Sequence, residues 1–219
     1  MLTTTAQHSR RLGRGQLRLA ALALLCVGLV SAGACHKAPA APISTEALNH
    51  SGDRIEFPQP QPLNVPGLAG VRAHQVKSLL NVRTKMGYGD FVWDADGIPN
   101  GPVWVLVDLG AQTMSVFRAG HEIGTTVLLF GMTGKPTPTG DLKVLHKDKD
   151  YWSHTYDAAM PYALRLTDDG VAIHGSDVVP GSATHGCLGV PVDFARRLFS
   201  VVNVGDEVMV VRTSRGRTA

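Results

Sequence analysis

Cysteine is scarce in this 219-residue chain, which has only Cys26, Cys35 and Cys187. Cys26 lies inside an apolar run near the N-terminus and Cys35 directly follows that run. Beyond residue 35 the sequence therefore has a single thiol, Cys187, which has no partner for an internal disulfide. A disulfide scaffold and a zinc site built from paired cysteines are both excluded for that part of the chain.

Signature motifs of several enzyme classes are also missing. Residues 131–135 are too short for a phosphate loop, and Pro136 stands where Ser or Thr is needed. Residues 87–89 lack the third glycine of a dinucleotide-binding loop. The chain has neither a Gly-x-Ser-x-Gly elbow nor a His-Glu-x-x-His run. These absences argue against a nucleotide-binding enzyme, a serine hydrolase of the elbow type and a zincin.

An excess of positive charge is absent once the N-terminus is set aside. The first 35 residues contain four arginines and no acid, so 17 of the 21 basic residues remain against all 18 acidic residues. A nearly neutral body lacks the basic footprint that nucleic-acid binding requires. We therefore expect no nucleic-acid partner.

The hydrophobic run at the N-terminus is short. Residues 19–34 fall short of the length that spans a hydrocarbon core of about 30 Å comfortably. Arginines precede the run, and Ala32, Gly33 and Ala34 end it just before Cys35, which is typical of a secretory signal. The small residues and Cys35 are similar to the lipobox of bacterial lipoproteins. Residues 1–35 are predicted to be a signal peptide with lipid attachment at Cys35, which exports the protein to the periplasm or cell envelope and ties it to a membrane. An ordinary cleavage after Ala34 is the alternative.

Composition divides the rest of the chain. Residues 36–70 hold six of the 13 prolines, which predicts an extended Pro-rich tether. Residues 71–99 form an N-terminal extension with a mixed signal, in which a short helix over 74–82 is one interpretation. Residues 100–212 are rich in short strand-like runs and form the predicted catalytic domain, and residues 213–219 are expected to be a disordered tail.

The domain from 100 to 212 is predicted to be mainly β, a sandwich or barrel with one or two short helices. Asp168-Asp169-Gly170 is a hairpin turn signal. Pro191 and Asp193 favour a helix over 192–202. Strands are expected at 103–108, 113–118, 125–130, 141–146, 162–166, 171–174 and 207–211.

The candidate catalytic residues lie close together in the sequence, between residues 171 and 191. A strand ends at His174, a loop follows, and Thr184-His185-Gly186 leads to the thiol of Cys187. Thiol catalysis requires the thiolate, and a free cysteine with a pKa of about 8.5 is mostly protonated at neutral pH, so a nearby imidazole must accept the proton. His174 and His185 are both candidates, since in an extended segment His185 would point to the same side as Cys187. Gly186 lets backbone amides approach an oxyanion closely.

Plainer interpretations stand beside this one. Cys187 could be an inert buried thiol, and His174 a structural histidine at a strand end. His174, His185 and Cys187 could also serve as the three ligands of an open zinc site.

The block resembles the signature of the L,D-transpeptidase (YkuD) catalytic domain family, in which a His-Gly strand end is followed by a loop and Ser/Thr-His-Gly-Cys. The wider resemblance runs from about 102 to 211. It implies that Cys187 is the nucleophile, that His174 is the base oriented by the Gly175 carbonyl, and that amides near His185 and Gly186 form the oxyanion hole. The substrate contacts are expected at Met160, Tyr162 and Thr184, with no cofactor or metal. Gly189 departs from the family pattern, in which Arg or Asn is common two residues after the cysteine.

The resemblance also implies a substrate class. The enzyme would acylate its cysteine on a tetrapeptide stem of peptidoglycan and transfer the acyl group to an amine, making a 3→3 cross-link or attaching a lysine-bearing envelope protein. Two alternatives remain open: an L,D-carboxypeptidase that uses water as the acceptor, and a non-catalytic peptidoglycan-binding lipoprotein.

Overall fold

The computed structural model describes residues 54–63 and 74–214. All of them belong to one compact unit, residues 43–219, and the second unit, residues 1–42, lies outside the described residues. The predicted signal peptide, Cys35, residues 36–53 and 64–70 of the predicted tether, and residues 215–219 of the predicted tail also lie outside them. Within the described ranges no helix has the length and hydropathy to cross a membrane.

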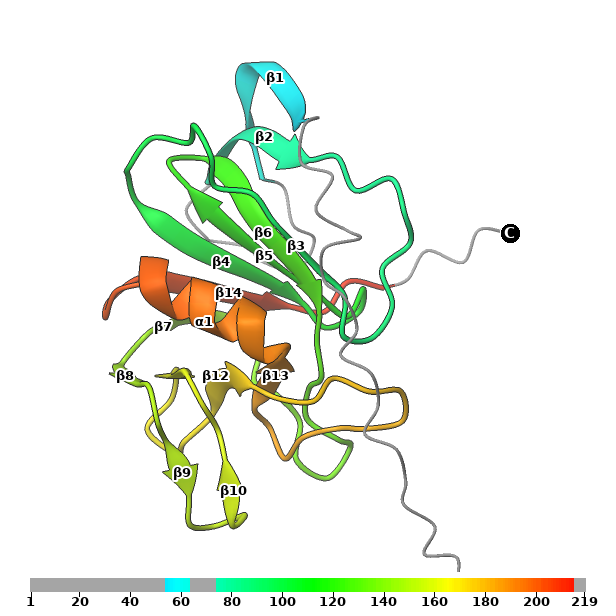
Figure 1. Ribbon diagram of the computed structural model, residues 1–219, viewed down its shortest axis with the longest axis vertical. Helices are drawn as coiled ribbons and strands as arrows, with labels where there is room; N and C mark the ends of the chain where they lie inside the picture. Colours follow the sequence, from blue (N-terminus) through cyan, green and yellow to red (C-terminus); the bar gives the residue numbers. More distant parts are fainter. Residues whose placement is uncertain (1–53, 64–73, 215–219) are drawn as a thin grey trace, which may run out of the picture. The chain divides into compact units, whose positions relative to one another are not determined.

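A large, mainly antiparallel sheet forms one layer of the fold (Figure 1). Strands β2 and β6, and strands β4 and β14, run parallel to one another, and β3 pairs with β6 beside the main path. The path is β1 (Arg54–Pro62), β2 (Gln75–Leu80), β6 (His121–Val127), β5 (Thr113–Arg118), β4 (Val103–Asp108), β14 (Glu207–Val211) and β7 (Gly140–Lys143), with β3 at Phe91–Trp93.

Both faces of this sheet are buried. Side chains alternate along a strand with a period of two, so Val103, Val105 and Val107 of β4 enter the main core while Trp104 enters a smaller one. Trp104 stacks on Phe117 with the ring centroids 3.9 Å apart. Strands β4 and β14 consequently have nearly continuous apolar sequences, as expected for central strands covered on both sides.

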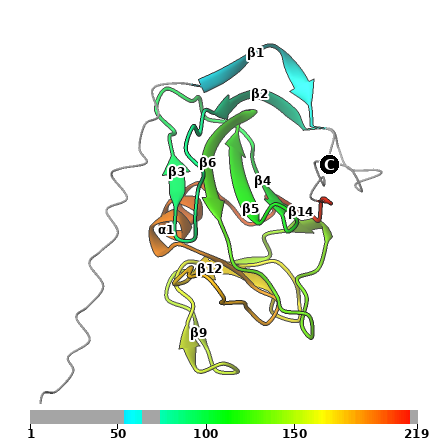
Figure 2. The ribbon, with the colours of Figure 1, turned by 90° about the vertical axis from the view of Figure 1, so that its right-hand side faces the viewer.

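A second, four-stranded sheet lies below the helix in Figure 2. Strands β12 and β13 are parallel and the other pairs antiparallel. Its order is β13 (Leu188–Val190), β12 (Ala172–Gly175), β11 (Ala163–Arg165) and β8 (His146–Asp148). A separate hairpin of β9 (Trp152–Ser153) and β10 (Ala158–Ala159) projects from the same region (Figure 1).

Helix α1 (Val192–Val201) joins the layers. Its buried face consists of Phe194, Ala195 and Leu198, which pack with residues of both sheets in the main core. Pro191 precedes its first turn, where proline's missing N–H costs no helical hydrogen bond. At its other end, Lys147 Nζ donates to the carbonyls of Phe199 at 2.7 Å and Val202 at 2.5 Å, which places a cation at the negative end of the helix dipole.

The prediction of a mainly β fold with one or two short helices is confirmed, with one α-helix among the described residues. Strands β4, β5 and β14 have the predicted bounds, and the hairpin turn at 168–170 joins β11 to β12. The prediction of a short helix over 74–82 is wrong, because alternate residues Val76, Ser78 and Leu80 are buried in strand β2. Strands β2 and β3 pair with β6, so the described part of the predicted extension belongs to the main sheet.

The predicted tether also needs correction over residues 54–62. These residues form strand β1, which pairs antiparallel with β2 through Arg54↔Leu80 and Pro62↔Gln75. The pairing is irregular between Glu56 and Gln61, where Pro58 and Pro60 lie. Proline cannot donate to a ladder and is tolerated at an edge strand or bulge, so the proline spacing is compatible with an edge strand.

The first residue of the predicted disordered tail is tied to the sheet. The Thr213 hydroxyl donates to Asp108 Oδ2 at 2.6 Å and its N–H donates to Asp108 Oδ1 at 3.1 Å. Burial alone would raise the pKa of Asp108, but hydrogen bonds from Thr213, Ala111 and Gly110 lower it below its usual value. The prediction of disorder is therefore wrong for residue 213.

Candidate active site

The register of the four-stranded sheet sorts its side chains onto two faces. Leu164, Ile173 and Leu188 lie opposite one another, are fully buried and face the main core. Because side chains alternate, the residues on either side of them face the other way. This second face, called the thiol face below, carries His146, Asp148, Ala163, Arg165, Ala172, His174 and Gly189.

Cys187 lies directly before β13, two residues before Gly189, and so on the thiol face with His174. It is 8% exposed. Its sulfur lies 3.8 Å from the Gly170 carbonyl, to which the thiol donates. Burial raises the pKa of the Cys187 thiol and the negative charge of Asp169 raises it further, whereas a hydrogen bond from the Ala172 amide lowers it. The thiol is therefore the neutral form in this state.

His174 is buried on β12, with Nδ1 2.9 Å from the Gly175 carbonyl. Because a carbonyl can only accept, Nδ1 carries the hydrogen and donates this bond, which leaves Nε2 as the basic nitrogen. Burial lowers the pKa of His174, and the hydrogen bond to Gly175 partly offsets this. The geometry matches the orienting contact expected for Gly175, while the catalytic role of His174 stays a prediction.

The backbone at Gly175 is closely packed by its neighbours. A Cβ there would lie 3.1 Å from Pro161 Cγ and 3.2 Å from Val192 Cα. The Gly175 N–H donates to the Pro161 carbonyl at 2.8 Å.

His185 has different surroundings from Cys187. Its exposed ring stacks on Tyr156 of the β9–β10 hairpin, with centroids 4.8 Å apart. Between His185 and Cys187, Gly186 has φ +116°, so the segment is not extended. The expectation that His185 points to the same side as Cys187 applies to an extended segment, and Gly186 does not meet that condition.

The turn at 184–187 is held by hydroxyl groups. Thr184 Oγ1 donates to the Cys187 carbonyl at 2.5 Å and accepts from the Gly186 N–H at 3.3 Å. Its backbone bonds to Phe130 and Met132. The hydroxyl of Thr184 thus supports the loop, while its predicted substrate contact stays a prediction. With the Gly186 amide engaged, the amides of His185 and Cys187 are the candidate oxyanion donors.

Thr137 was missed by the sequence analysis. Its buried hydroxyl accepts from the Gly131 N–H at 3.0 Å and donates to the Gly186 carbonyl at 2.8 Å. A Cβ on Gly131 would lie 2.1 Å from the Lys135 carbonyl oxygen and 2.9 Å from Gly186 Cα, so three segments converge here. The run of Thr and Pro at 136–139, which is part of the family resemblance, was the available signal.

The two hydrophobic residues expected to contact substrate differ in position. Tyr162 packs edge to face on Phe199 of α1, with centroids 5.8 Å apart, and belongs to the fringe of the main core. It is half-buried and its ring faces the helix side of the sheet, and its predicted substrate contact stays a prediction. Met160 is half-buried and its N–H bonds to the Tyr151 carbonyl; its predicted contact stays a prediction.

Gly189 permits a close approach of backbones. It exchanges two hydrogen bonds with Leu129, at 2.8 and 2.9 Å. A Cβ at position 189 would lie 3.1 Å from Ser176 Cβ and 3.4 Å from Leu129 Cβ. The departure from the family pattern thus has a local packing reason, and position 189 gives the thiol face no side chain.

The zinc interpretation has no support in the geometry. Among residues 54–63 and 74–214, no group of three His, Cys, Asp or Glu side chains lies close enough together to hold a metal ion. The ring of His185, one of the three ligands considered, stacks on Tyr156.

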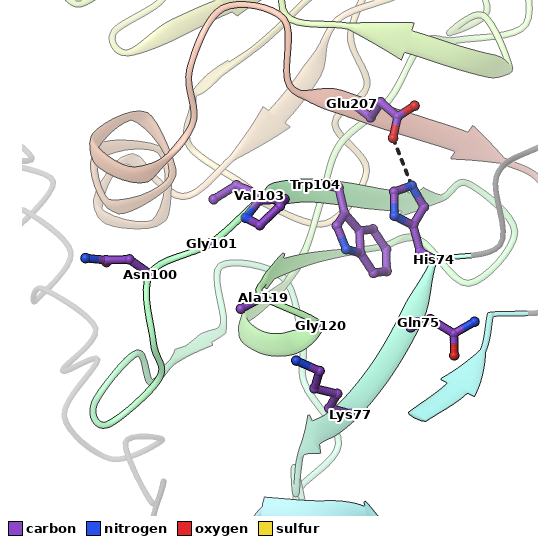
Figure 3. Close-up of a pocket in the computed structure, with 11 residues that line it drawn as sticks. His74, Gln75, Lys77, Asn100, Gly101, Val103, Trp104, Ala119, Gly120 and Glu207 are labelled. Atoms are coloured by element: carbon purple, nitrogen blue, oxygen red, sulfur yellow. Dashed lines mark ion pairs between the residues drawn. The ribbon is translucent and has the colours of Figure 1, made fainter. Parts of the chain in front are cut away.

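Two cavities are large enough to hold part of a substrate. The larger, about 410 Å³, lies at the start of β4, beside the stack of His74 on Trp104 and the 3.0 Å ion pair of His74 with Glu207 (Figure 3). Its lining includes no cysteine, serine or threonine. The smaller, about 300 Å³, is called the thiol-side cavity because Gly170 and Ala172, which contact the Cys187 sulfur, line it. The other residues that line it are His146, Asp148, Tyr151, Ala163 and Arg165.

Comparison with known proteins matches residues 102–210 to the family model described as YkuD, L,D-transpeptidase catalytic domain. "L,D-transpeptidase 1" of Mycobacterium tuberculosis H37Rv is 27% identical over 123 residues, which cover 48% of this chain and 49% of that protein. The chain thus matches about half the length of this curated relative. An L,D-transpeptidase structure from Stackebrandtia nassauensis is 27% identical, with 55% and 62% coverage and a TM-score of 0.47. An L,D-transpeptidase in complex with imipenem is 25% identical, with 50% and 58% coverage and a TM-score of 0.47.

Proposed function

Residues 102–210 belong to the L,D-transpeptidase catalytic domain family, and from this premise we propose that the chain is a cysteine-dependent acyltransferase acting on peptidoglycan stem peptides. The observation that carries the proposal is the register of the four-stranded sheet. In this register Cys187 and His174 lie on the same face of the sheet. The thiol-side cavity adjoins that face and is lined by Gly170 and Ala172, which contact the sulfur.

In the acylation step, Cys187 Sγ attacks the carbonyl carbon of the third stem residue. The C–S bond forms and the C–N bond to the terminal D-alanine breaks. One proton is transferred in this step: His174 Nε2 takes it from the thiol and gives it to the leaving nitrogen, so that D-alanine leaves as a free amine. The tetrahedral oxyanion would be stabilised by backbone amides at 185 and 187. The product is a thioester on Cys187.

The resting state must change before attack. The thiol donates to the Gly170 carbonyl, and burial favours both the neutral thiol and the neutral imidazole. Rotation about the Cα–Cβ bond of Cys187 is the small motion available to turn the sulfur from Gly170 toward His174. Proton transfer then accompanies attack, since a stable thiolate is disfavoured in this environment.

In the transfer step an amine attacks the thioester, the C–N bond forms and the C–S bond breaks, and the thiol regains its proton through His174. The acceptor is an amine of another stem or a lysine of an envelope protein. Water in place of the amine would make the chain an L,D-carboxypeptidase.

Acylation can be tested directly by mass spectrometry. Purified protein incubated with a tetrapeptide muropeptide or with imipenem is expected to gain the mass of one acyl adduct, and Cys187→Ala none. His174→Ala is expected to slow acylation by about 100-fold or more, the range for loss of a general base, and His185→Ala far less. Equal products from the wild type and Cys187→Ala would refute the proposal.

A non-catalytic peptidoglycan-binding module is the second candidate, and one observation favours it. The thiol is 8% exposed and burial raises its pKa, as for an inert cysteine. Slow alkylation of Cys187 at neutral pH is expected under both candidates, so it does not separate them. Saturable peptidoglycan binding without any acyl adduct would favour the binding module.

Export and lipid attachment at Cys35 form part of the proposal, supported by the sequence of residues 10–35. The protein is expected in the membrane fraction of its host. Cys35→Ser should release it to the soluble envelope fraction, and recovery of that variant in membranes would refute the lipid anchor.

A further inference from the structure

The thiol-side cavity has small residues at its base and charged residues on its walls. Ala163, Gly170 and Ala172 are small, and the last two lie between the cavity and the Cys187 sulfur, which they contact. Arg165, His146 and Asp148 carry the polar groups. A cavity of about 300 Å³ with this arrangement suits a small charged group held within one residue of the nucleophile, across Gly170 and Ala172.

The guanidinium of Arg165 is available to a ligand. Arg165 is exposed and forms no side-chain hydrogen bond or ion pair within the described part of the chain. Its direct cross-strand neighbours are His146 and Ala172, so an imidazole lies on one side and the strand next to Cys187 on the other. An arginine fork with an imidazole N–H beside it is a geometry that binds a carboxylate.

Asp148 faces the same cavity without neutralising Arg165. It lies two residues beyond His146 on β8, which makes it a diagonal neighbour of Arg165 at a Cα separation of about 7–8 Å. No ion pair joins these two side chains within the described ranges. Opposite charges held apart in one cavity suit a ligand that carries a carboxylate and an amine.

We propose that the thiol-side cavity is the subsite for the α-amino carboxylate whose nitrogen is bonded to, or attacks, the acyl carbon, with Arg165 and His146 binding its carboxylate. The inference rests on the proposed acyl transfer. Asp148 attracts the ammonium form of the same residue before it attacks or after it leaves.

Distances along the sheet agree with this assignment. Cys187 adjoins Ala172, and Arg165 is one strand further, so their Cα atoms are about 10 Å apart at two strand spacings. The carboxyl carbon of the residue in question is three bonds from the attacked carbon, within about 4 Å. A carboxylate between the sulfur and the Arg165 side chain fills this interval.

The same chemistry occurs in both half-reactions. In acylation the donor's terminal residue leaves with its nitrogen and its carboxylate on adjacent atoms. In transfer an amine with a neighbouring carboxylate enters by the reverse of that path. One subsite therefore serves the leaving residue and an amino-acid acceptor. Of the two acceptors proposed above, it favours an amine of another stem over a protein lysine, whose side-chain amine has no neighbouring carboxylate.

The enzymatic test compares carboxylate with carboxamide. For the wild type, a tetrapeptide donor with a free C-terminal carboxylate is expected to exceed its C-terminal carboxamide in kcat/KM by about 10- to 100-fold, the range for loss of a hydrogen bond to a charged group. Arg165→Gln should abolish this preference, and Arg165→Lys should retain part of it. Arg196→Gln, on the exposed face of α1, is the matched control and should retain all of it. The donor comparison tests recognition of the leaving residue. Repeating it with D-alanine and D-alaninamide as acceptors tests recognition of the entering residue.

A binding test does not depend on activity. D-Alanine titrated into Cys187→Ala is expected to shift the amide resonances of Ala163 and Ala172 saturably, D-alaninamide much less, and neither ligand should do so when Arg165→Gln is added. Equal carboxylate and carboxamide responses in both tests would overturn the subsite while acylation stands. No acylation of any donor by the wild type would overturn the proposed function, and the titration would still decide the subsite.

Discussion

Thr137 offers the sharpest test of how the nucleophile turn is held. Its hydroxyl is 4% exposed and connects the Gly131 N–H, at 3.0 Å, to the Gly186 carbonyl, at 2.8 Å. Thr137→Val keeps the shape of the side chain and removes both hydrogen bonds. Each bond contributes about 0.5–1.5 kcal/mol, and a buried group left without a partner costs about 1–3 kcal/mol. We expect a loss of about 2–4 kcal/mol in the free energy of unfolding.

Thr137→Ser is the matched control. It keeps the hydroxyl and loses one methyl group, which costs about 1 kcal/mol. Urea denaturation of the three proteins at equal m-value measures the difference. Because Gly186 adjoins Cys187, Thr137→Val should also slow acylation by imipenem by about 100-fold, the effect of a displacement near 1 Å at a reacting group, while Thr137→Ser acylates at nearly the wild-type rate. A serine variant as unstable as the valine variant would refute the hydrogen-bond argument.

Three further predictions concern the backbone at Gly186, the pKa of His174 and the edge strand β1. Gly186→Ala, at φ +116°, should cost about 1–3 kcal/mol and impair acylation, whereas Gly134→Ala, with open space around it, should change stability by less than about 0.5 kcal/mol in the same denaturation assay. Burial lowers the pKa of His174, so its basic form persists to lower pH and the acidic limb of the acylation rate should lie below pH of about 6.5; a limb above that value would contradict the burial argument. Arg54→Gln removes the 3.1 Å hydrogen bond to Ser78 and should speed amide exchange in β1 without changing acylation.

Two of the large-sheet strands that were predicted correctly share one property. In β4 and β14 nearly every residue is apolar, because cores cover both faces of the sheet, and such short runs between turns are recognisable in a sequence. Strand β2 was misread because Ser78 occupies a buried position. Its hydroxyl bonds to Arg54 and to His121 Nδ1 at 2.9 Å, partners 24 and 43 residues away that no local pattern reveals.

The residues of the candidate site also divide into those that local sequence reveals and those that depend on distant partners. Cys187 and His174 were recognisable because a lone thiol and a strand-ending histidine are visible along the chain, and the register then gives them one face. Thr137 was not, because its bond to Gly186 joins residues 49 apart. The direction of His185 relative to Cys187 depends on the positive φ of Gly186, which a period-two argument does not anticipate. Arg165 depends on a three-strand register that sequence spacing alone does not fix.

The prolines of β1 also bear on the solubility of the folded protein. Strand β1 is the outermost strand of the large sheet, and residues 58 and 60 within it offer no N–H to an incoming chain. An outer strand without those donors is a poor template for intermolecular pairing. A shortened chain that begins after residue 63 would instead present β2, with its regular row of amides, as the border of the sheet, and would be prone to aggregate through it.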